Sequence, residues 1–153
     1  WLCHLVLGLA IGLGPVGAWV AATGTTPPEA LLIGAGVAFW IAGFDVIYAF
    51  MDIEVDRAQK LHSIPADLGE APALWFTRGF HVAAIALLAL AGWAQGTNFV
   101  YYVGVAVCGI LLFYENWVMR RADLAKVGVA FMTMNGIISV VFLFFATLSL
   151  FVP

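Results

Sequence analysis

Three aspartates at helical spacing are the clearest chemical feature of the sequence. Asp45 lies inside an apolar run, and Asp52 and Asp56 follow at the end of that run. At about 100° per residue, the chain from Asp45 to Asp52 returns to within ~20° of its starting direction, and the step to Asp56 adds about 40°. One face of a continuous helix would therefore carry all three carboxylates, whereas Glu54 would point to the opposite face.

Converging carboxylates repel each other unless a cation lies among them. Hard oxygen ligands suit Mg²⁺, which takes one or two protein carboxylates and completes its shell with water and phosphate oxygens. The stripe of aspartates therefore predicts a phosphorylated ligand, and a diphosphate fits well. Three residues that follow, Arg57, Lys60 and His62, are candidates to meet the remaining phosphate charge.

A plainer interpretation of the same residues is a polar membrane interface. A D-x-x-x-D pattern at the end of a membrane helix suits such an interface, and Arg57 and Lys60 suit charges that only set membrane topology. Asp45 weakens this alternative, because a carboxylate inside a membrane helix is costly and usually functional.

The composition indicates that these residues sit in a membrane protein. Of the 153 residues, 64% are hydrophobic and 10% are charged, which leaves too few polar residues to cover a water-soluble globule. The formal net charge of -3, with no nucleic-acid motif, argues against a nucleic-acid partner. The sequence predicts an all-α integral membrane protein that lies in the lipid bilayer. Because no internal repeat is present, we expect residues 1–153 to belong to a single membrane domain.

Five apolar segments of about 20 residues, the length that crosses a bilayer, predict five transmembrane helices. We place them at residues 2–22, 30–51, 74–93, 99–118 and 127–152. The third is the weakest prediction, because Arg78 and His81 lie near its start; we expect both to reach the membrane interface, with a cavity-facing His81 as the alternative. The glycines Gly8, Gly12, Gly34 and Gly36 predict close helix packing.

The basic residues predict the orientation in the membrane. Turn-forming residues at 23–28 and 95–98 contain no Lys or Arg. All the basic side chains lie in or beside the other two connections: Arg57, Lys60, Arg78, Arg120, Arg121 and Lys126. By the positive-inside rule these connections and the N-terminus face the cytoplasm, in a bacterial inner membrane by our prediction. Trp1 is not an initiator Met, so we expect the chain to be a fragment.

One extended motif reads Phe44-Asp45-x-x-Tyr48-Ala49-x-x-Asp52-x-x-x-Asp56, then Leu61-His62-Ser63-Ile64-Pro65-x-x-x-Gly69. It resembles the second aspartate-rich motif of the UbiA superfamily of intramembrane prenyltransferases. Further stretches resemble helices of the same enzymes: 4–10, 15–19, 114–116 with 123–124, and 135–139. The resemblance implies a bundle of nine helices around a cavity, with this chain as helices five to nine.

The resemblance also implies a missing partner. The first aspartate-rich motif of the family, N-D-x-x-D-x-x-x-D, has no counterpart here, so an N-terminal half of the same protein is expected to supply it. Lys60 stands where relatives commonly have Gly, which leaves open how tightly that loop turns.

The reaction implied by the resemblance is Mg²⁺-dependent transfer of a polyprenyl group from an isoprenyl diphosphate to an aromatic acceptor such as 4-hydroxybenzoate, for quinone biosynthesis. Asp52 and Asp56 would be the metal ligands, and Asp45 a third catalytic carboxylate, as a ligand or on the acceptor side. The remaining site residues would be Arg57, Lys60, His62 and Ser63 for the diphosphate, and Tyr48 for the acceptor pocket. A helix cap is an equally good role for Ser63.

Alternatives remain for the acceptor and for the class of protein. Prenylation of aminodeoxyfutalosine for menaquinone fits the resemblance about equally. An ion-coupled transporter fragment would use the same intramembrane aspartates, but it predicts inverted repeats or broken helices, and no convincing repeat is present. In the later spans, Glu115 suits an interfacial ion pair about as well as a catalytic role, and Asn135 suits a hydrogen bond between helices.

Overall fold

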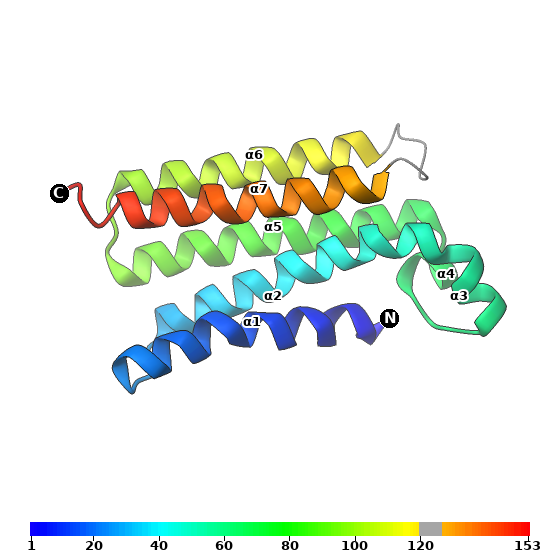
Figure 1. The fold of residues 1–153 in the computed structure, drawn as a ribbon, viewed down its shortest axis with the longest axis horizontal. Helices are drawn as coiled ribbons and strands as arrows, with labels where there is room; N and C mark the ends of the chain where they lie inside the picture. Colours follow the sequence, from blue (N-terminus) through cyan, green and yellow to red (C-terminus); the bar gives the residue numbers. More distant parts are fainter. Residues whose placement is uncertain (120–126) are drawn as a thin grey trace.

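Long helices lying side by side form the fold (Figure 1). The computed structural model describes residues 1–119 and 127–153, and all regular structure in those ranges is helical. The long elements are α1 (Leu2–Thr23), α2 (Pro28–Tyr48), α5 (Glu70–Gln95), α6 (Phe99–Met119) and α7 (Val127–Leu148). The N-terminus lies at the end of the bundle that also holds the short helices α3 (Ile53–Gln59) and α4 (Ile64–Leu68). The C-terminus lies at the opposite end (Figure 1).

Four helices in the described part of the chain are long and apolar enough to cross a bilayer: α1, α2 with its continuation, α5 and α6. The apolar part of α7 that the structure describes, Thr133–Leu148, is shorter than the ~20 residues of a full span. Four spans therefore indicate an integral membrane protein, and the fifth stays a prediction. The basic residues Arg120, Arg121 and Lys126 lie outside the described residues.

The two connections without basic residues are the tight turns that the sequence predicts. Gly24 and Gly96 each follow a helix with φ of 71°, a left-handed conformation that glycine adopts without steric cost. Pro28 then opens α2, where its missing N–H costs nothing. The observed α5 starts at Glu70, about one turn before the predicted start of the third span.

The second span does not continue as one α-helix through Asp56, and this part of the prediction is wrong. A 3₁₀ turn, η1 (Ala49–Asp52), ends α2, and the short helices α3 (Ile53–Gln59) and α4 (Ile64–Leu68) follow. The tight turn accompanies burial of Phe50, which packs with Val46 and Ile47 against Ile64. Because each 3₁₀ residue turns about 120°, four of them shift the later carboxylates by ~80° from the predicted face.

Glycines bring α1 and α2 into close contact, as the sequence predicts. A Cβ added at Gly8 would collide with the carbonyl oxygen of Ala38, and one at Gly12 with that of Gly34. On the other side of α2, a Cβ at Gly36 would lie 3.0 Å from the Leu88 side chain of α5. Small residues allow helices in lipid to gain dispersion contacts, since no hydrophobic effect drives them together there.

The remaining helices pack in the same way. A Cβ at Gly104 of α6 would collide with Phe145 of α7. Beside this contact, Trp40, Ala84, Cys108 and Ile138 form a buried apolar cluster that joins α2, α5, α6 and α7. One face of α6 is therefore covered by α7.

We expect Gly8→Val to destabilise the bundle by about 1–3 kcal/mol, because its side chain has no space against Ala38. Thermal unfolding in detergent measures the change. Gly14→Val is the matched control on the same helix, since a Cβ at Gly14 meets nothing within 4 Å. Equal losses in the two variants would contradict the packing described here.

Candidate functional site

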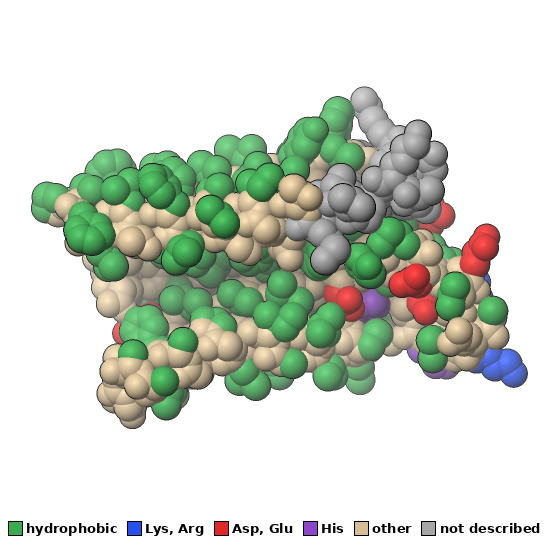
Figure 2. Space-filling view, viewed as in Figure 1, with side chains coloured by type: hydrophobic (Ala, Val, Ile, Leu, Met, Phe, Trp, Pro, Cys, Tyr) green, Lys and Arg blue, Asp and Glu red, His purple; other side chains and the backbone are tan. Residues whose placement is uncertain are grey.

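The three aspartates lie at one end of the bundle. Asp45 is in the last turn of α2, Asp52 ends η1, and Asp56 is in α3. Figure 2 shows acidic side chains gathered at this end, around the short helices. The structure therefore brings the predicted carboxylates into one region, although their individual partners differ.

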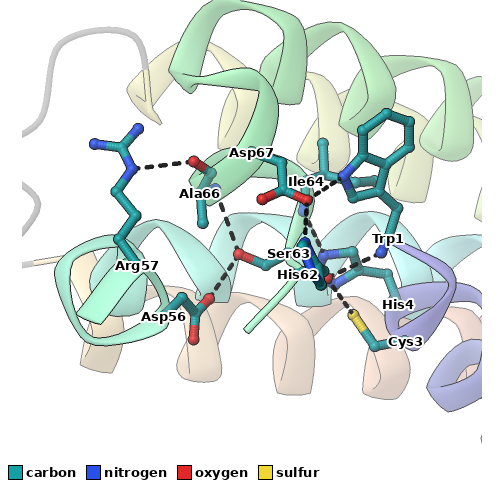
Figure 3. A network of polar contacts seen from close by, with 10 residues as sticks. All are labelled: Trp1, Cys3, His4, Asp56, Arg57, His62, Ser63, Ile64, Ala66 and Asp67. Carbon is teal, nitrogen blue, oxygen red and sulfur yellow. Dashed lines mark hydrogen bonds and ion pairs between the residues drawn. The ribbon is translucent and has the colours of Figure 1, made fainter. Parts of the chain in front are cut away.

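His4 of α1 holds Asp45 in place. The Nδ1 atom of His4 lies 2.6 Å from Oδ2 of Asp45, and the backbone N–H of Ile64 donates to Nε2 of His4 over 3.2 Å. A backbone N–H can only donate, so Nε2 is the acceptor, and the proton on Nδ1 is donated to Asp45. This buried ring connects α1 to α2. Figure 3 shows its second contact, with Ile64 at the start of α4.

Sequence reasoning did not assign His4 a role. The available signal was a histidine inside an otherwise apolar membrane helix, which needs a polar partner in the protein because lipid offers none. The partner lies 41 residues away, and no local pattern links the two positions.

Ser63 holds Asp56 and caps α4 at the same time. Its hydroxyl donates to Oδ2 of Asp56 over 2.6 Å and accepts from the N–H of Ala66 over 3.4 Å (Figure 3). The cap proposed as the alternative role of Ser63 is therefore present. Its hydrogen bond also fixes one carboxylate oxygen of Asp56.

Arg57 is anchored through only one of its nitrogens. Its Nε donates to the carbonyl oxygen of Ala66 over 3.0 Å, and the terminal guanidinium nitrogens extend beyond that contact (Figure 3). The residue is exposed. The anchored stem and outward fork match the geometry that arginine uses for phosphate.

Lys60 ends α3 in a left-handed conformation, with φ of 56° and ψ of 35°. Of the non-glycine residues that the structure describes, it alone has a positive φ. This conformation strains a residue with a Cβ, and glycine usually fills it after a helix. The loop at Lys60 is therefore a tight turn.

His62 contacts Asp67. The Nδ1 atom of the exposed His62 ring lies 2.9 Å from Oδ2 of Asp67, which also accepts from Nε1 of Trp1 over 2.7 Å. The hydrogen bond from His62 lowers the pKa of the Asp67 carboxyl below its ordinary value. A phosphate-binding role for His62 would therefore compete with this contact.

Tyr48 lies one turn beyond Asp45 and is 40% exposed. Its ring centroid is 6.3 Å from that of Phe44, in a tilted aromatic pair. The tyrosine is thus accessible at the same end of the bundle as the carboxylates.

Contrary to the prediction from the sequence, the three aspartates do not share one face of a regular helix. The 3₁₀ turn rotates Asp52 and Asp56 relative to Asp45, and His4 engages Asp45. Among the described residues no group of three or more His, Cys, Asp or Glu side chains is placed to hold a metal ion. The assignment of Asp52 and Asp56 as metal ligands stays a prediction.

The pair Asp52 and Asp56 still fits Mg²⁺, because this ion needs only one or two protein carboxylates beside water and phosphate oxygens. Asp52 is exposed and has no hydrogen-bond or ion-pair partner in the described part of the chain. Asp56 uses only Oδ2 for Ser63.

Polar side chains in the later helices are buried more deeply than expected. Glu115 is 2% exposed, and Arg120 and Arg121, its expected ion-pair partners, lie outside the described residues, so the ion pair stays a prediction. His81 is 4% exposed and its Nδ1 accepts from Nδ2 of Asn116 over 2.7 Å, so it does not reach the membrane interface. This hydrogen bond joins α5 to α6. A similar contact between helices is predicted for Asn135, but the Oδ1 atom of Asn135 has no partner among the described residues.

The chain is similar in sequence to proteins of known family. The model of the UbiA prenyltransferase family matches residues 1–151. The 4-hydroxybenzoate octaprenyltransferase of Nitrosococcus oceani is 30% identical over 136 residues, which is 89% of this chain and 47% of that protein. The mitochondrial 4-hydroxybenzoate polyprenyltransferase of Arabidopsis thaliana is 34% identical over 122 residues, or 78% of this chain and 29% of that protein.

A solved structure has the same arrangement. The apo structure of a UbiA homolog from Aeropyrum pernix K1 aligns with a TM-score of 0.77 and 30% identity, over 96% of this chain and 55% of that one. The chain therefore spans about half or less of the length of these relatives.

We expect His4→Ala to lower the free energy of unfolding by about 1–3 kcal/mol, because it removes a partner from both Asp45 and the Ile64 N–H. His4→Asn should retain part of that stability, since an amide can still donate to Asp45. Thermal unfolding in detergent compares both with His62→Ala, a control at an exposed ring. If His4→Ala unfolds at the same temperature as the parent chain, the bridge has no structural role.

We expect Lys60→Gly to raise the free energy of unfolding by up to about 1 kcal/mol, because glycine adopts the left-handed turn without strain. Ala58→Gly, inside α3, is the control and should lose about 1 kcal/mol. Denaturant titration measures both. A loss of stability in both variants would show that the turn at Lys60 is not strained.

Proposed function

The chain belongs to the UbiA prenyltransferase family, and from that premise we propose that its protein transfers a polyprenyl group from an isoprenyl diphosphate to an aromatic acceptor, with Mg²⁺. The relatives named for 4-hydroxybenzoate support that compound as the acceptor. The observation that carries the proposal is the pair of carboxylates at the polar end of the bundle: Asp52 without a partner in the described residues, and Asp56 oriented by Ser63.

Asp52 and Asp56 would hold Mg²⁺, with water and diphosphate oxygens as the other ligands. When bound, the metal would neutralise the negative charge that develops on the departing diphosphate. Ser63 donates to one oxygen of Asp56 and so directs the other oxygen away from α4. This hydrogen bond pre-orients the carboxylate before any ligand arrives.

Arg57 would bind the diphosphate with its terminal guanidinium nitrogens, because its Nε is already occupied by Ala66. Lys60 lies three residues further on, at the end of the same short helix, and its ammonium group would add a mobile point charge. His62 would join them only by releasing Asp67. We therefore rank Arg57 first among the three.

Asp45 would serve the acceptor side of the site. Its Oδ2 accepts from His4, and its other oxygen is left to accept from an acceptor hydroxyl. A phenol hydroxyl that donates to a carboxylate makes its ring more electron-rich, which favours attack on an allylic cation. Tyr48, exposed one turn away, would line the same pocket.

Further ligands for the metal and diphosphate would come from a part of the protein outside these 153 residues. The support is that the chain matches 47% of one relative, and that no group of three or more potential ligand side chains forms among the described residues. We place this end of the bundle on the cytoplasmic side of a bacterial inner membrane, because the described basic residues Arg57, Lys60 and Arg78 all lie near it.

We expect Asp52→Asn, in the whole protein in lipid nanodiscs, to lower Mg²⁺-dependent prenylation of 4-hydroxybenzoate by about 10²-fold or more, because the amide is a poor ligand for a hard cation. Release of diphosphate and formation of the prenylated product are measured together. Glu54→Gln is the control on the neighbouring helix and should stay near the parent rate. Undiminished turnover by Asp52→Asn would show that Asp52 is not a metal ligand.

A further inference from the structure

A cavity of about 460 Å³ lies between α5 and α6. Its walls include Val82 and Ile85 from α5, and Gly109 and Phe113 from α6. None of the predicted site residues lines it. Most of the cavity is lined by apolar side chains, and its polar end is formed by Arg78 and Asn116. The proposed reaction does not use this cavity.

The cavity opens on the side of α6 that α7 does not cover. Gly104 and Cys108 of α6 contact Phe145 and Ile138 of α7. Gly109 lies about 100° or more round the helix from those two positions. Because Val82 and Phe113 are 70% and 73% exposed in the part of the chain that the structure describes, the cavity is an open groove on this face of the α5–α6 pair.

Arg78 forms the charged end of this groove. Its guanidinium carbon lies 4.8 Å from the centroid of the Trp75 ring, and no carboxylate pairs with it in the described part of the chain. Arg78 is the ninth residue of α5, so it lies about 12 Å along the axis from the start of the helix. An exposed tryptophan beside an arginine near a helix end is typical of the headgroup level of a bilayer.

Asn116 adds an unsatisfied acceptor at the same end. Its Nδ2 donates to Nδ1 of His81 over 2.7 Å and to the carbonyl oxygen of Leu112 over 2.9 Å. Its Oδ1 is buried without a hydrogen-bond partner among the described residues, and the side chain is only 5% exposed. A buried acceptor of this kind is costly until a donor reaches it.

We propose that this groove binds an anionic phospholipid with a glycerol headgroup. The phosphate would pair with the guanidinium of Arg78, a headgroup hydroxyl would donate to Oδ1 of Asn116, and an acyl chain would lie along Val82, Ile85 and Phe113. The combination of a cation, an unsatisfied acceptor and an apolar channel selects this occupant. A zwitterionic lipid would bring a second positive charge to Arg78, and free phosphate would leave the apolar length unfilled.

The test uses the whole protein and counts retained lipids by native mass spectrometry after exchange into equal amounts of dioleoyl phosphatidylglycerol and dioleoyl phosphatidylcholine. We expect phosphatidylglycerol to be retained about tenfold over phosphatidylcholine, the scale of one charge-assisted, forked hydrogen-bonded pair. Arg78→Gln should bring the ratio close to one, and Arg78→Lys should leave an intermediate ratio. An unchanged ratio in Arg78→Gln would overturn the proposal.

A second variant tests the apolar part of the groove. A Cβ at Gly109 would lie 3.7 Å from Ile85, so Gly109→Leu is accommodated at its base while its branch fills the groove. We expect it to lower the retention of both lipids several-fold, whereas Gly14→Leu, at an open position on α1, should not. Full retention by Gly109→Leu, or release of phosphatidylglycerol by millimolar inorganic phosphate, would show that no lipid chain occupies the groove.

Discussion

The close approach of α1 to α2 is the constraint on which the carboxylate end depends. His4, Gly8 and Gly12 lie four residues apart along α1 and share one face. The glycines let the two backbones meet, and only at that separation does the His4 ring reach Asp45 and the Ile64 N–H. The glycine contact between α1 and α2 thus positions His4 against Asp45. Through the Ile64 N–H, His4 also connects the start of α4 to the bundle.

The bilayer explains why so many polar groups in this chain have dedicated partners. Lipid offers no hydrogen bonds, so an imidazole, a carboxylate or an amide inside a membrane helix must find its partner in the protein or in a ligand. The His4–Asp45 pair satisfies this requirement internally. The hydrogen bond from Asn116 to His81 satisfies it only in part, because Nε2 of His81 is buried without a partner among the described residues. Asp52 and the Oδ1 atom of Asn116 have no partner in the described residues, and each marks a place where a ligand would supply one.

The parts of the structure that follow from local chemistry could be predicted from the sequence. Apolar length predicted the four spans found in the described residues, Gly24 and Gly96 predicted the turns, and Gly8 and Gly12 predicted the helix contact. Two features could not be predicted in this way. The 3₁₀ turn before Asp52 depends on how Phe50 packs against a segment further along the chain, and the partner of His4 is 41 residues away. A helical wheel drawn through Asp56 assumes regular α-helical geometry, so it overlooked the 3₁₀ turn that rotates Asp52 and Asp56 relative to Asp45.

We propose that Asp52 and Asp56 form the metal-binding part of a diphosphate site, with Asp45 engaged separately by His4. The most direct measurement is an experimental structure of the whole protein with Mn²⁺ and an unreactive prenyl diphosphate analogue, with the metal located by anomalous scattering. A metal peak within coordination distance of Asp52 and Asp56, with Asp45 still bonded to His4, is the expected result. A peak coordinated by other residues, with Asp52 and Asp56 out of reach, would contradict the assignment.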